Sequence, residues 1–530
     1  MTYKILITDN LSPQGLDLIE AADDVEFDVV TGLTTEALTK KIVGYDGLIV
    51  RSSVTVTEAV LKAADKLKVV GRAGVGVDNI DVNTASLLGI IVMNTPEANT
   101  VATTEHTVAL LLALCRHIPQ AHATLRAGKW DRKQFKGVEL CGKTLGVIGM
   151  GRIGSRVATR CQSFGMDVIT HDPYLSDDMA HRLKVKRVTL SELFANADFI
   201  TLHAALTPNT QGLINRETIA QMKQGVRIVN AARGALIDEE ALTEGLESGK
   251  IAGVALDVFT EEPPNPDHPL LGFDNVVVTP HLAASTEEAQ RDVSTQVVEQ
   301  MLDALRDVEY RHAINLPIAD VELLHLLRPY LDLAEKVGSF QTQLAEDAIQ
   351  KIEIEVKGDP INHQVKPITV ALLKGILEPV LHHAVNYVNA PYLAQERGIT
   401  ISQTSSLHTP DYPNLISCRV EWAGGSRTVS ATLFNKDEPR FVQVDGYRVD
   451  VHPEGIILMT HSYDRPGFIG RVGNVLGELG INIATWRTGR AEPGGLAVSF
   501  ITVDHDVPER VLRLLDEFEL IQKIQKVHLL

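Results

Sequence analysis

The feature that most constrains the fold is a regular alternation of short, β-branched apolar runs with amphipathic stretches over the first 300 residues. Such runs lie at 3–8 (YKILIT), 47–52 (GLIVRS), 144–149 (TLGVIG) and 226–233 (VRIVNAAR), with helical patterns between them. Repeated strand-helix alternation gives parallel sheets that are covered by helices on both faces. Because two such series follow one another, we predict an α/β protein with two doubly wound parallel-sheet lobes. Ligands are expected in the cleft between them, at the carboxyl ends of the strands.

The chain is too long for a single core, because one core stops growing near 250–300 residues. We place the first lobe at 1–98 and the second at 99–282, which opens with a long apolar helix from Asn99 to His117, followed by a loop that contains Gly128, Lys129 and Trp130. The helical segment 283–314 is expected to return the chain to the first lobe. Beyond it, residues 317–453 mix helices with alternating strands and predict an α+β domain. Residues 455–530 follow the strand order of the ferredoxin-like βαββαβ motif.

Composition excludes several classes of partner. The 530 residues hold 50 basic and 68 acidic side chains, a net charge of −18, which argues against binding to nucleic acid. No apolar run reaches the roughly 18–20 residues that span a bilayer, and the N-terminus lacks the pattern of a signal peptide. The four cysteines are scattered in a way that suits reduced thiols better than disulfides or a metal site. We therefore expect a cytoplasmic protein with no membrane partner and no metal.

A glycine-rich turn predicts a dinucleotide site. Gly149, Gly151 and Gly154 follow an apolar strand and open a helix, which allows a tight turn and a close approach to a pyrophosphate. Asp172 ends the next strand about 20 residues on, where a carboxylate accepts hydrogen bonds from the adenosine ribose and repels a 2′-phosphate. Residues 173–178 contain no Arg or Lys to reverse that preference. A plain structural turn is the alternative. We predict a Rossmann second lobe that binds NAD, beside a flavodoxin-like first lobe for the substrate.

Three polar residues follow strands of the second lobe, where chemistry is expected. His281 is a candidate base for the hydroxyl proton of an alcohol, and Glu262 for the carboxylate that orients it. Arg233 is suited to clamp a substrate carboxylate in two-point fashion. Each has an ordinary structural alternative on its own: a helix cap for His281, a turn acid for Glu262 and a surface charge for Arg233. Their occurrence together favours hydride transfer between NAD and a small 2-hydroxy acid.

The run from about 45 to 290 resembles the D-isomer-specific 2-hydroxy acid dehydrogenase family. The motifs that carry the resemblance are GRAGVGVDNID, NTPEANTVATTEHTVALLL, KTLGVIGMGRIGSRVA, NAARGALIDEEAL, GVALDVFTEEP and TPHLAASTEEAQ. It implies that Arg233 orients the substrate, that Glu262 is the partner acid and that His281 exchanges the proton. Further contacts with NAD are implied for Val75, Arg152, Ile153, Ala204, Ala231, Asp257 and Ala284.

Within that family the chain resembles the long members that oxidise 3-phospho-D-glycerate to 3-phosphohydroxypyruvate, the first step of L-serine biosynthesis. Such a substrate carries up to three negative charges, so the first lobe should supply cations. The implied substrate contacts are Arg51, Ser52, Arg72, Gly74 and Asn99. Pairing of the two arginines with Asp78 or Asp46 at the surface is the alternative.

The C-terminal βαββαβ segment is similar to an ACT regulatory domain. By that resemblance Asp464 and Asn482 are the candidate effector contacts, L-serine is the expected effector, and paired domains imply a homotetramer. The alternative for Asp464 is a position near the N-cap of a helix, with Pro466 at its first turn, in a domain that only dimerises.

Two rival functions remain open from the sequence. One is a reductase of hydroxypyruvate, glyoxylate or 2-oxoglutarate that runs mainly backwards. The other is a non-enzymatic co-repressor that keeps this fold as an NADH sensor. The first-lobe arginines and the extra domains argue against the reductase, and the acidic charge argues against the co-repressor.

Overall fold

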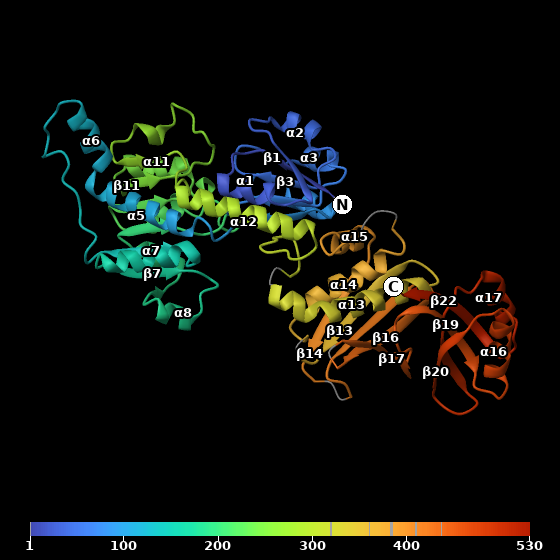
Figure 1. Cartoon of the computed structure of the whole chain (residues 1–530). Coiled ribbons are helices and arrows are strands. Elements are labelled where there is room, and N and C mark those ends of the chain that lie inside the picture. Colours follow the sequence, from blue (N-terminus) through green and yellow to red (C-terminus); the bar gives the residue numbers. More distant parts are fainter. Residues whose placement is uncertain are drawn as a thin grey trace.

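The computed structural model describes residues 2–318, 321–359, 361–381, 385–408, 411–435 and 437–529. Two lobes built on parallel sheets lie side by side, bridged by a long helix, and two further sheets lie beyond them toward the C-terminus (Figure 1). The mixed α/β architecture that the sequence predicted is confirmed.

The first sheet is parallel throughout, with the order β2-β1-β3-β4-β5. This is the flavodoxin-like order that the sequence predicted for the first lobe. Its elements are β1 (Tyr3–Ile7), α1 (Pro13–Glu20), β2 (Val25–Val29), α2 (Thr35–Lys41), β3 (Gly47–Val50), α3 (Glu58–Ala63), β4 (Val69–Arg72), α4 (Val82–Leu87) and β5 (Ile91–Asn94).

The second sheet is also parallel, with the order β12-β11-β10-β9-β6-β7-β8. The chain enters at β6, builds outward through β7 and β8, and then returns to the other side of β6. Strands β6 and β9 therefore form the topological switch point of the sheet, beside which ligands bind in such folds.

The strands of this sheet are β6 (Thr144–Ile148), β7 (Asp167–His171), β8 (Lys186–Arg187), β9 (Phe199–Leu202), β10 (Val226–Asn230), β11 (Ile251–Leu256) and β12 (Val276–Val278). Its helices are α5 (Thr100–Arg116), α7 (Arg152–Ser163), α8 (Asp177–Arg182), α9 (Leu190–Asn196), α10 (Arg216–Gln221), η1 (Gly234–Leu236), α11 (Glu239–Glu247) and η2 (Pro269–Gly272).

One helix of the second lobe differs from the sequence prediction. The sequence predicted a loop directly after the long helix that ends at His117, but a second helix, α6 (Ile118–Arg126), follows at once. His117 adopts a left-handed conformation with φ of 51°, which breaks the first helix, and Pro119 fits the first turn of the next. None of the residues in α6 is buried, and Ile118 and Leu125 are exposed although their spacing places them on one face of the helix.

Helix α12 (Glu287–Leu305) leaves the second lobe and packs on the sheet of the first (Figure 1). Its residues Val293, Val297 and Met301 are buried in one cluster with Ile5 and Ile49. The chain therefore crosses between the lobes twice, once before α5 and once along α12, which is the arrangement of two bodies flanking a cleft.

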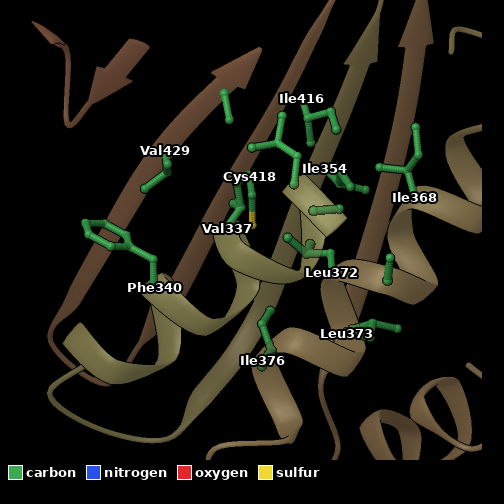
Figure 2. Close-up of a cluster of buried hydrophobic side chains, with 14 of the residues drawn as sticks. Val337, Phe340, Ile354, Ile368, Leu372, Leu373, Ile376, Ile416, Cys418 and Val429 are labelled. Carbon is green, nitrogen blue, oxygen red and sulfur yellow. The ribbon is translucent and has the colours of Figure 1, made fainter. Parts of the chain in front are cut away.

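The intervening region is a six-stranded sheet, order β14-β13-β15-β16-β17-β18, covered by a helix pair. Figure 2 shows the interior face, where Val337 and Phe340 from one helix and Leu372 and Ile376 from the other lie against Cys418 and other strand residues. The elements are α13 (Val321–Leu344), β13 (Ile349–Lys357), α14 (Val365–Leu377), α15 (Ala390–Glu396), β14 (Thr400–Ser406), β15 (Leu415–Trp422), β16 (Gly425–Phe434), β17 (Glu438–Val444) and β18 (Tyr447–Val451).

The last sheet is antiparallel, with the order β20-β21-β19-β22 and two helices on one face. Its elements are β19 (Gly455–Tyr463), α16 (Phe468–Glu478), β20 (Ile483–Arg490), β21 (Leu496–Val503), α17 (Glu509–Asp516) and β22 (Ile521–Leu529). This is the βαββαβ order that the sequence predicted. The face without helices packs against the intervening region, where the rings of Phe500 and Phe340 lie 6.3 Å apart within one continuous core.

Within the described part of the chain, no helix combines the length and the apolar character needed to cross a membrane.

Candidate active site

A pocket of about 550 Å³ opens between the two lobes and collects all the candidate catalytic and substrate residues selected from the sequence. The second lobe contributes Arg233, Glu262 and His281, which follow the neighbouring strands β10, β11 and β12. The other predicted residues that line the pocket are Arg51, Ser52, Arg72, Gly74, Val75, Asn99 and Ala284. Candidate catalytic and substrate residues are thus brought together although they lie up to 230 positions apart in the chain.

His281 and Glu262 form a direct pair at the mouth of the pocket. Nδ1 of His281 lies 2.7 Å from Oε2 of Glu262, and the other carboxylate oxygen accepts a hydrogen bond from the backbone N–H of Phe259 at 3.1 Å. Burial raises the pKa of Glu262, but the hydrogen bonds from His281 and Phe259 outweigh it and leave the pKa below its usual value. The carboxylate is therefore ionised at neutral pH and suited to hold the imidazole.

The backbone at His281 is in the left-handed region, with φ of 53°, which is unusual for a residue with a side chain. Its N–H donates to the carbonyls of Asp257 and Thr279, at 2.9 and 3.0 Å. These two bonds fix the turn that aims the imidazole at Glu262. The alternative of a helix cap at His281 is wrong, since Thr286 caps α12.

Arg233 reaches across to the first lobe. Its Nε donates to Oδ2 of Asp78 at 2.9 Å, and its Nη1 donates to the carbonyl of Ala232 at 2.7 Å. A methyl group on Gly76 would lie 1.8 Å from Nη2 of Arg233, so only glycine leaves room for this guanidinium. Gly76 was not selected from the sequence, and Asp78 was named only as an alternative partner for Arg51 and Arg72, although both stand in the GRAGVGVDNID motif.

The first-lobe side of the pocket is rich in cations. Arg72 ends β4 and Arg51 follows β3, on neighbouring strands. Burial and the nearby charge of Arg233 lower the pKa of Arg72 to about 10, with Asp78 opposing the change. In the described residues, Nε of Arg72 is buried and lacks a hydrogen-bond partner. Neither Asp78 nor Asp46 pairs with Arg51 or Arg72, because Asp78 pairs with Arg233 and Asp46 accepts from the backbone of Lys4.

The predicted dinucleotide residues lie along the carboxyl edge of the second sheet. Gly149 follows β6, with φ of 91°, and a methyl group there would meet the carbonyl of His203 and the N–H of Ala204 at 2.7–2.8 Å. Gly151 is the N-cap of α7, and a methyl group on it would meet nothing within 4 Å. Gly154, Arg152 and Ile153 form the first turn of this helix. The close strands and the open helix N-terminus fit a pyrophosphate.

Asp172 stands directly after β7, beside the glycine turn. Its Oδ2 accepts from the N–H of Met150 at 2.7 Å and its Oδ1 from the N–H of Tyr174 at 2.8 Å. Both oxygens keep a free lone pair, as recognition of the two ribose hydroxyls requires. Ala231 follows β10 in the same row of strand ends. Together with the glycine turn, these groups fit NAD.

Asp257 is fully buried at the end of β11 and organises the turn that carries His281. It accepts from Thr279 Oγ1 at 2.6 Å and from the N–H groups of Leu282 and Ala283 at 2.7 and 2.9 Å. It also lies 3.0 Å from Nε2 of His106 on α5. Burial raises its pKa, but the bonds from His106, Thr279 and the two amides leave it below its usual value. Sequence reasoning missed His106 and Thr279, which stand in quoted motifs but show their partner only in space.

The structure does not bring the two candidate effector residues into one site. Asp464 lines a pocket at the start of α16 and forms an ion pair with Arg490 of β20. Asn482 donates to Asp504 at 2.7 Å and does not line that pocket. The alternative of Asp464 near a helix N-cap is wrong, because α16 begins at Phe468 with Gly467 as its N-cap.

Three family models match successive parts of the chain. They are the NAD-binding domain of D-isomer specific 2-hydroxyacid dehydrogenases at 108–283, the D-3-phosphoglycerate dehydrogenase intervening domain at 326–445 and the ACT domain at 456–519.

Curated relatives match almost end to end. A D-3-phosphoglycerate dehydrogenase of Methanocaldococcus jannaschii is 46% identical and covers 99% of this chain and 100% of the relative. The D-3-phosphoglycerate dehydrogenase of Bacillus subtilis is 41% identical, over 96% of this chain and 97% of the relative.

Solved structures match the two lobes. The TT0316 protein of Thermus thermophilus is 37% identical with a TM-score of 0.55, over 59% of this chain and 99% of that one. A D-lactate dehydrogenase of Aquifex aeolicus, complexed with NAD and lactic acid, is 28% identical with a TM-score of 0.53, over 57% and 96%. The predicted NAD-binding domain, intervening domain and ACT domain are confirmed, and the chain belongs to the D-3-phosphoglycerate dehydrogenase family of NAD-dependent oxidoreductases.

Proposed function

We propose that the protein oxidises 3-phospho-D-glycerate to 3-phosphohydroxypyruvate with NAD, as the first step of L-serine biosynthesis. The observation that carries this proposal is the pocket between the lobes, which is lined by three guanidinium groups and by the pair of His281 and Glu262. The chain as a whole has a net charge of −18, which disfavours binding of anions. The three arginines make this pocket an exception, which supports an anionic substrate.

His281 acts as the base for the C2 hydroxyl group. Glu262 holds Nδ1, which leaves Nε2 as the nitrogen that accepts the hydroxyl proton. The resulting imidazolium is stabilised by the ionised carboxylate 2.7 Å away. When bound, NAD supplies the acceptor for the hydride that leaves C2 as the C2–H bond breaks.

Arg233 binds the substrate carboxylate and orients C2. Its Nε is held by Asp78, which fixes the plane of the guanidinium across the cleft. Arg51 and Arg72 bind the phosphate, with Ser52, Gly74 and Asn99 beside them. Because Arg72 has a buried donor with no partner among the described residues, an oxyanion there gains a bond without breaking one.

The cofactor contacts assigned in this proposal are those at the carboxyl edge of the second sheet. Gly149, Gly151 and the first turn of α7 would hold the pyrophosphate, and Asp172 the adenosine ribose. Val75, Ala204, Ala231, Asp257 and Ala284 would line the rest of the site.

Steady-state turnover of the full chain tests the proposal. We expect oxidation of 3-phospho-D-glycerate with NAD, much slower oxidation of D-lactate and weak use of NADP. Equal turnover of phosphorylated and unphosphorylated hydroxy acids would contradict it. A preference for reducing glyoxylate or hydroxypyruvate would favour the reductase alternative, and no turnover at all would favour a sensor.

We further propose that L-serine regulates the enzyme through the ACT domain, at the pocket that Asp464 lines, and that the protein works in the cytoplasm as a homotetramer. The presence of an ACT domain behind a catalytic unit that supplies the serine pathway supports the first part. Calorimetric titration with L-serine and light scattering of the purified protein test the effector and the assembly.

A further inference from the structure

The pocket of the ACT domain lies where the loop after β19, the start of α16 and the hairpin of β20 and β21 meet. It measures about 620 Å³. Its polar lining consists of Ser462, Asp464, Arg465, Thr488, Arg490 and Ser499. The inference below rests on the proposed binding of an amino acid to this domain and concerns which group recognises which end of the ligand.

Ser462 points an unused hydrogen-bonding group into this pocket. The residue is 1% exposed, and its hydroxyl has no partner among the residues that the structure describes. The hydroxyl groups of Thr488 and Ser499 lie 2.9 Å apart on the neighbouring strands and satisfy each other. A buried hydroxyl without a partner is costly unless a ligand or water reaches it. Ser462 therefore marks a position for a polar ligand atom.

The start of α16 adds a positive end to the same pocket. The helix has 11 residues, and its N-cap is Gly467, with φ of 94° and, in the described structure, no capping side chain. A methyl group on Gly467 or Gly470 would meet nothing within 4 Å. The N–H of Phe468 donates to the carbonyl of Arg465 at 3.3 Å, but the N–H groups of Ile469 and Gly470 have no partner among the described residues. Uncapped N–H groups and the helix dipole favour an anion at this place.

The pocket contains an ion pair whose two charged groups can each bind one end of an amino acid. Arg490 and Asp464 are in direct contact, with 52% and 29% of their side chains exposed. An ion pair this accessible is weak, because solvent screens it. A zwitterion can replace both partners at once, with its carboxylate on Arg490 and its ammonium on Asp464, so no charge is left unpaired.

We propose that Arg490 is the carboxylate-binding residue of the effector pocket and that an α-amino acid binds by opening the Arg490–Asp464 pair. The α-carboxylate lies between Arg490 and the first turn of α16, and the ammonium lies on Asp464. The hydroxyl of Ser462 faces the remaining ligand atoms and favours a short polar side chain. Arg490 stands at the end of β20, and from this position it selects ligands that carry a carboxylate.

Calorimetric titration of the full-length protein with three small probes tests this assignment. The probes are L-serine, 3-hydroxypropanoate, which lacks the ammonium, and ethanolamine, which lacks the carboxylate. We expect serine to bind most tightly, 3-hydroxypropanoate more weakly and ethanolamine not measurably. Arg490→Gln should weaken serine at least tenfold and abolish 3-hydroxypropanoate, whereas Arg490→Lys should lie between because it keeps the charge but not the fork.

Arg487→Gln is the matched control, since Arg487 is an exposed arginine of the same strand that does not line the pocket. It should change neither binding nor turnover. Unchanged serine affinity in Arg490→Gln, tighter binding of ethanolamine than of 3-hydroxypropanoate, or the absence of any binding would overturn the assignment. Turnover of NAD and 3-phospho-D-glycerate by the unmodified protein is measured separately, so failure of the proposed reaction is distinguished from failure of this site.

Discussion

Nδ1 of His281 lies 2.7 Å from Oε2 of Glu262, although the two residues follow different strands, β12 and β11. The contact depends on the left-handed turn at His281, which is held by the carbonyls of Asp257 and Thr279. The pair is thus built into the rim of the second sheet before any substrate arrives. This preorganisation is what a proton-transfer site requires.

Replacing either member of this pair should lower the turnover number with little effect on folding. We expect His281→Asn to reduce kcat by about 10²–10⁴-fold, the usual contribution of a positioned base. Glu262→Gln should cost less, because the amide still accepts the backbone N–H of Phe259 but no longer stabilises the imidazolium. Stopped-flow measurement of NADH formation checks both. Retention of near-normal kcat in His281→Asn would rule out its role as the base.

Removing a first-lobe guanidinium should harm phosphorylated substrates selectively. Arg51→Ala is expected to raise KM for 3-phospho-D-glycerate by about 10- to 100-fold, since a charge-assisted hydrogen bond contributes about 1.5–3 kcal/mol. KM for an unphosphorylated hydroxy acid should change far less. Arg126→Ala, an exposed arginine of α6, controls for the loss of one positive charge. Equal losses for both substrates would refute a phosphate role.

Asp172 should set the choice of dinucleotide. Asp172→Ala is expected to raise KM for NAD by about 10- to 100-fold, on the same scale of hydrogen-bond energies. It should also reduce the difference in kcat/KM between NAD and NADP. Asp172→Asn removes the charge and keeps one acceptor oxygen, for the N–H of either Met150 or Tyr174, so it tests the repulsion of a 2′-phosphate with part of the turn geometry retained. An unaltered ratio of kcat/KM for the two dinucleotides in both variants would contradict the assignment.

A methyl group at Gly76 should displace Arg233. In Gly76→Ala the new carbon would lie 1.8 Å from Nη2 of Arg233 and 2.8 Å from Oδ2 of Asp78, so the guanidinium must move. We expect kcat/KM to fall by about 10²-fold or more, as for other misplaced orienting groups, while the midpoint of thermal unfolding shifts little. Gly272→Ala, where the methyl meets nothing within 4 Å, is the control. Full activity in Gly76→Ala would mean that Arg233 need not hold this position.

Asp257 should make the second lobe sensitive to acid. Its pKa is lower in the folded state than its ordinary value, so its stabilising contribution is complete above the ordinary value and is lost as the pH falls through the folded one. Asp257→Asn should lower the thermal midpoint at neutral pH and flatten the decline below about pH 4. Asp267→Asn, at an exposed turn, should follow the unmodified protein. Parallel acid profiles for both variants would show that Asp257 carries no such linkage.

The sequence predicted those parts of the molecule that depend on local patterns. Strand order in the last domain and the glycine turn before α7 follow from the period of apolar residues and from turn chemistry, both of which are local. Helix α6 was missed because the break at His117 is a single left-handed residue, which the pattern of apolar residues does not reveal.

Other parts of the site depend on how the lobes meet. The contact between Arg233 and Asp78 crosses the cleft, and the contact between His106 and Asp257 joins α5 to β11. No spacing in the sequence encodes such distances. In the same way, Arg490 stands 26 positions from Asp464 and becomes its neighbour only when β20 forms the edge of its sheet.

The apolar core that joins the intervening sheet to the ACT sheet has a consequence for how this half of the protein can change. Because Ile457, Met459 and Phe500 are buried among the side chains of the other sheet, neither sheet has a finished surface of its own. Cleaving the chain near residue 454 and separating the two parts would expose an apolar surface on each, so they would not behave as two independent domains. Substitutions on the helical face and loops of the ACT domain can therefore be accommodated locally, but transferring this domain to another protein would also require changes to the face that packs on the intervening sheet.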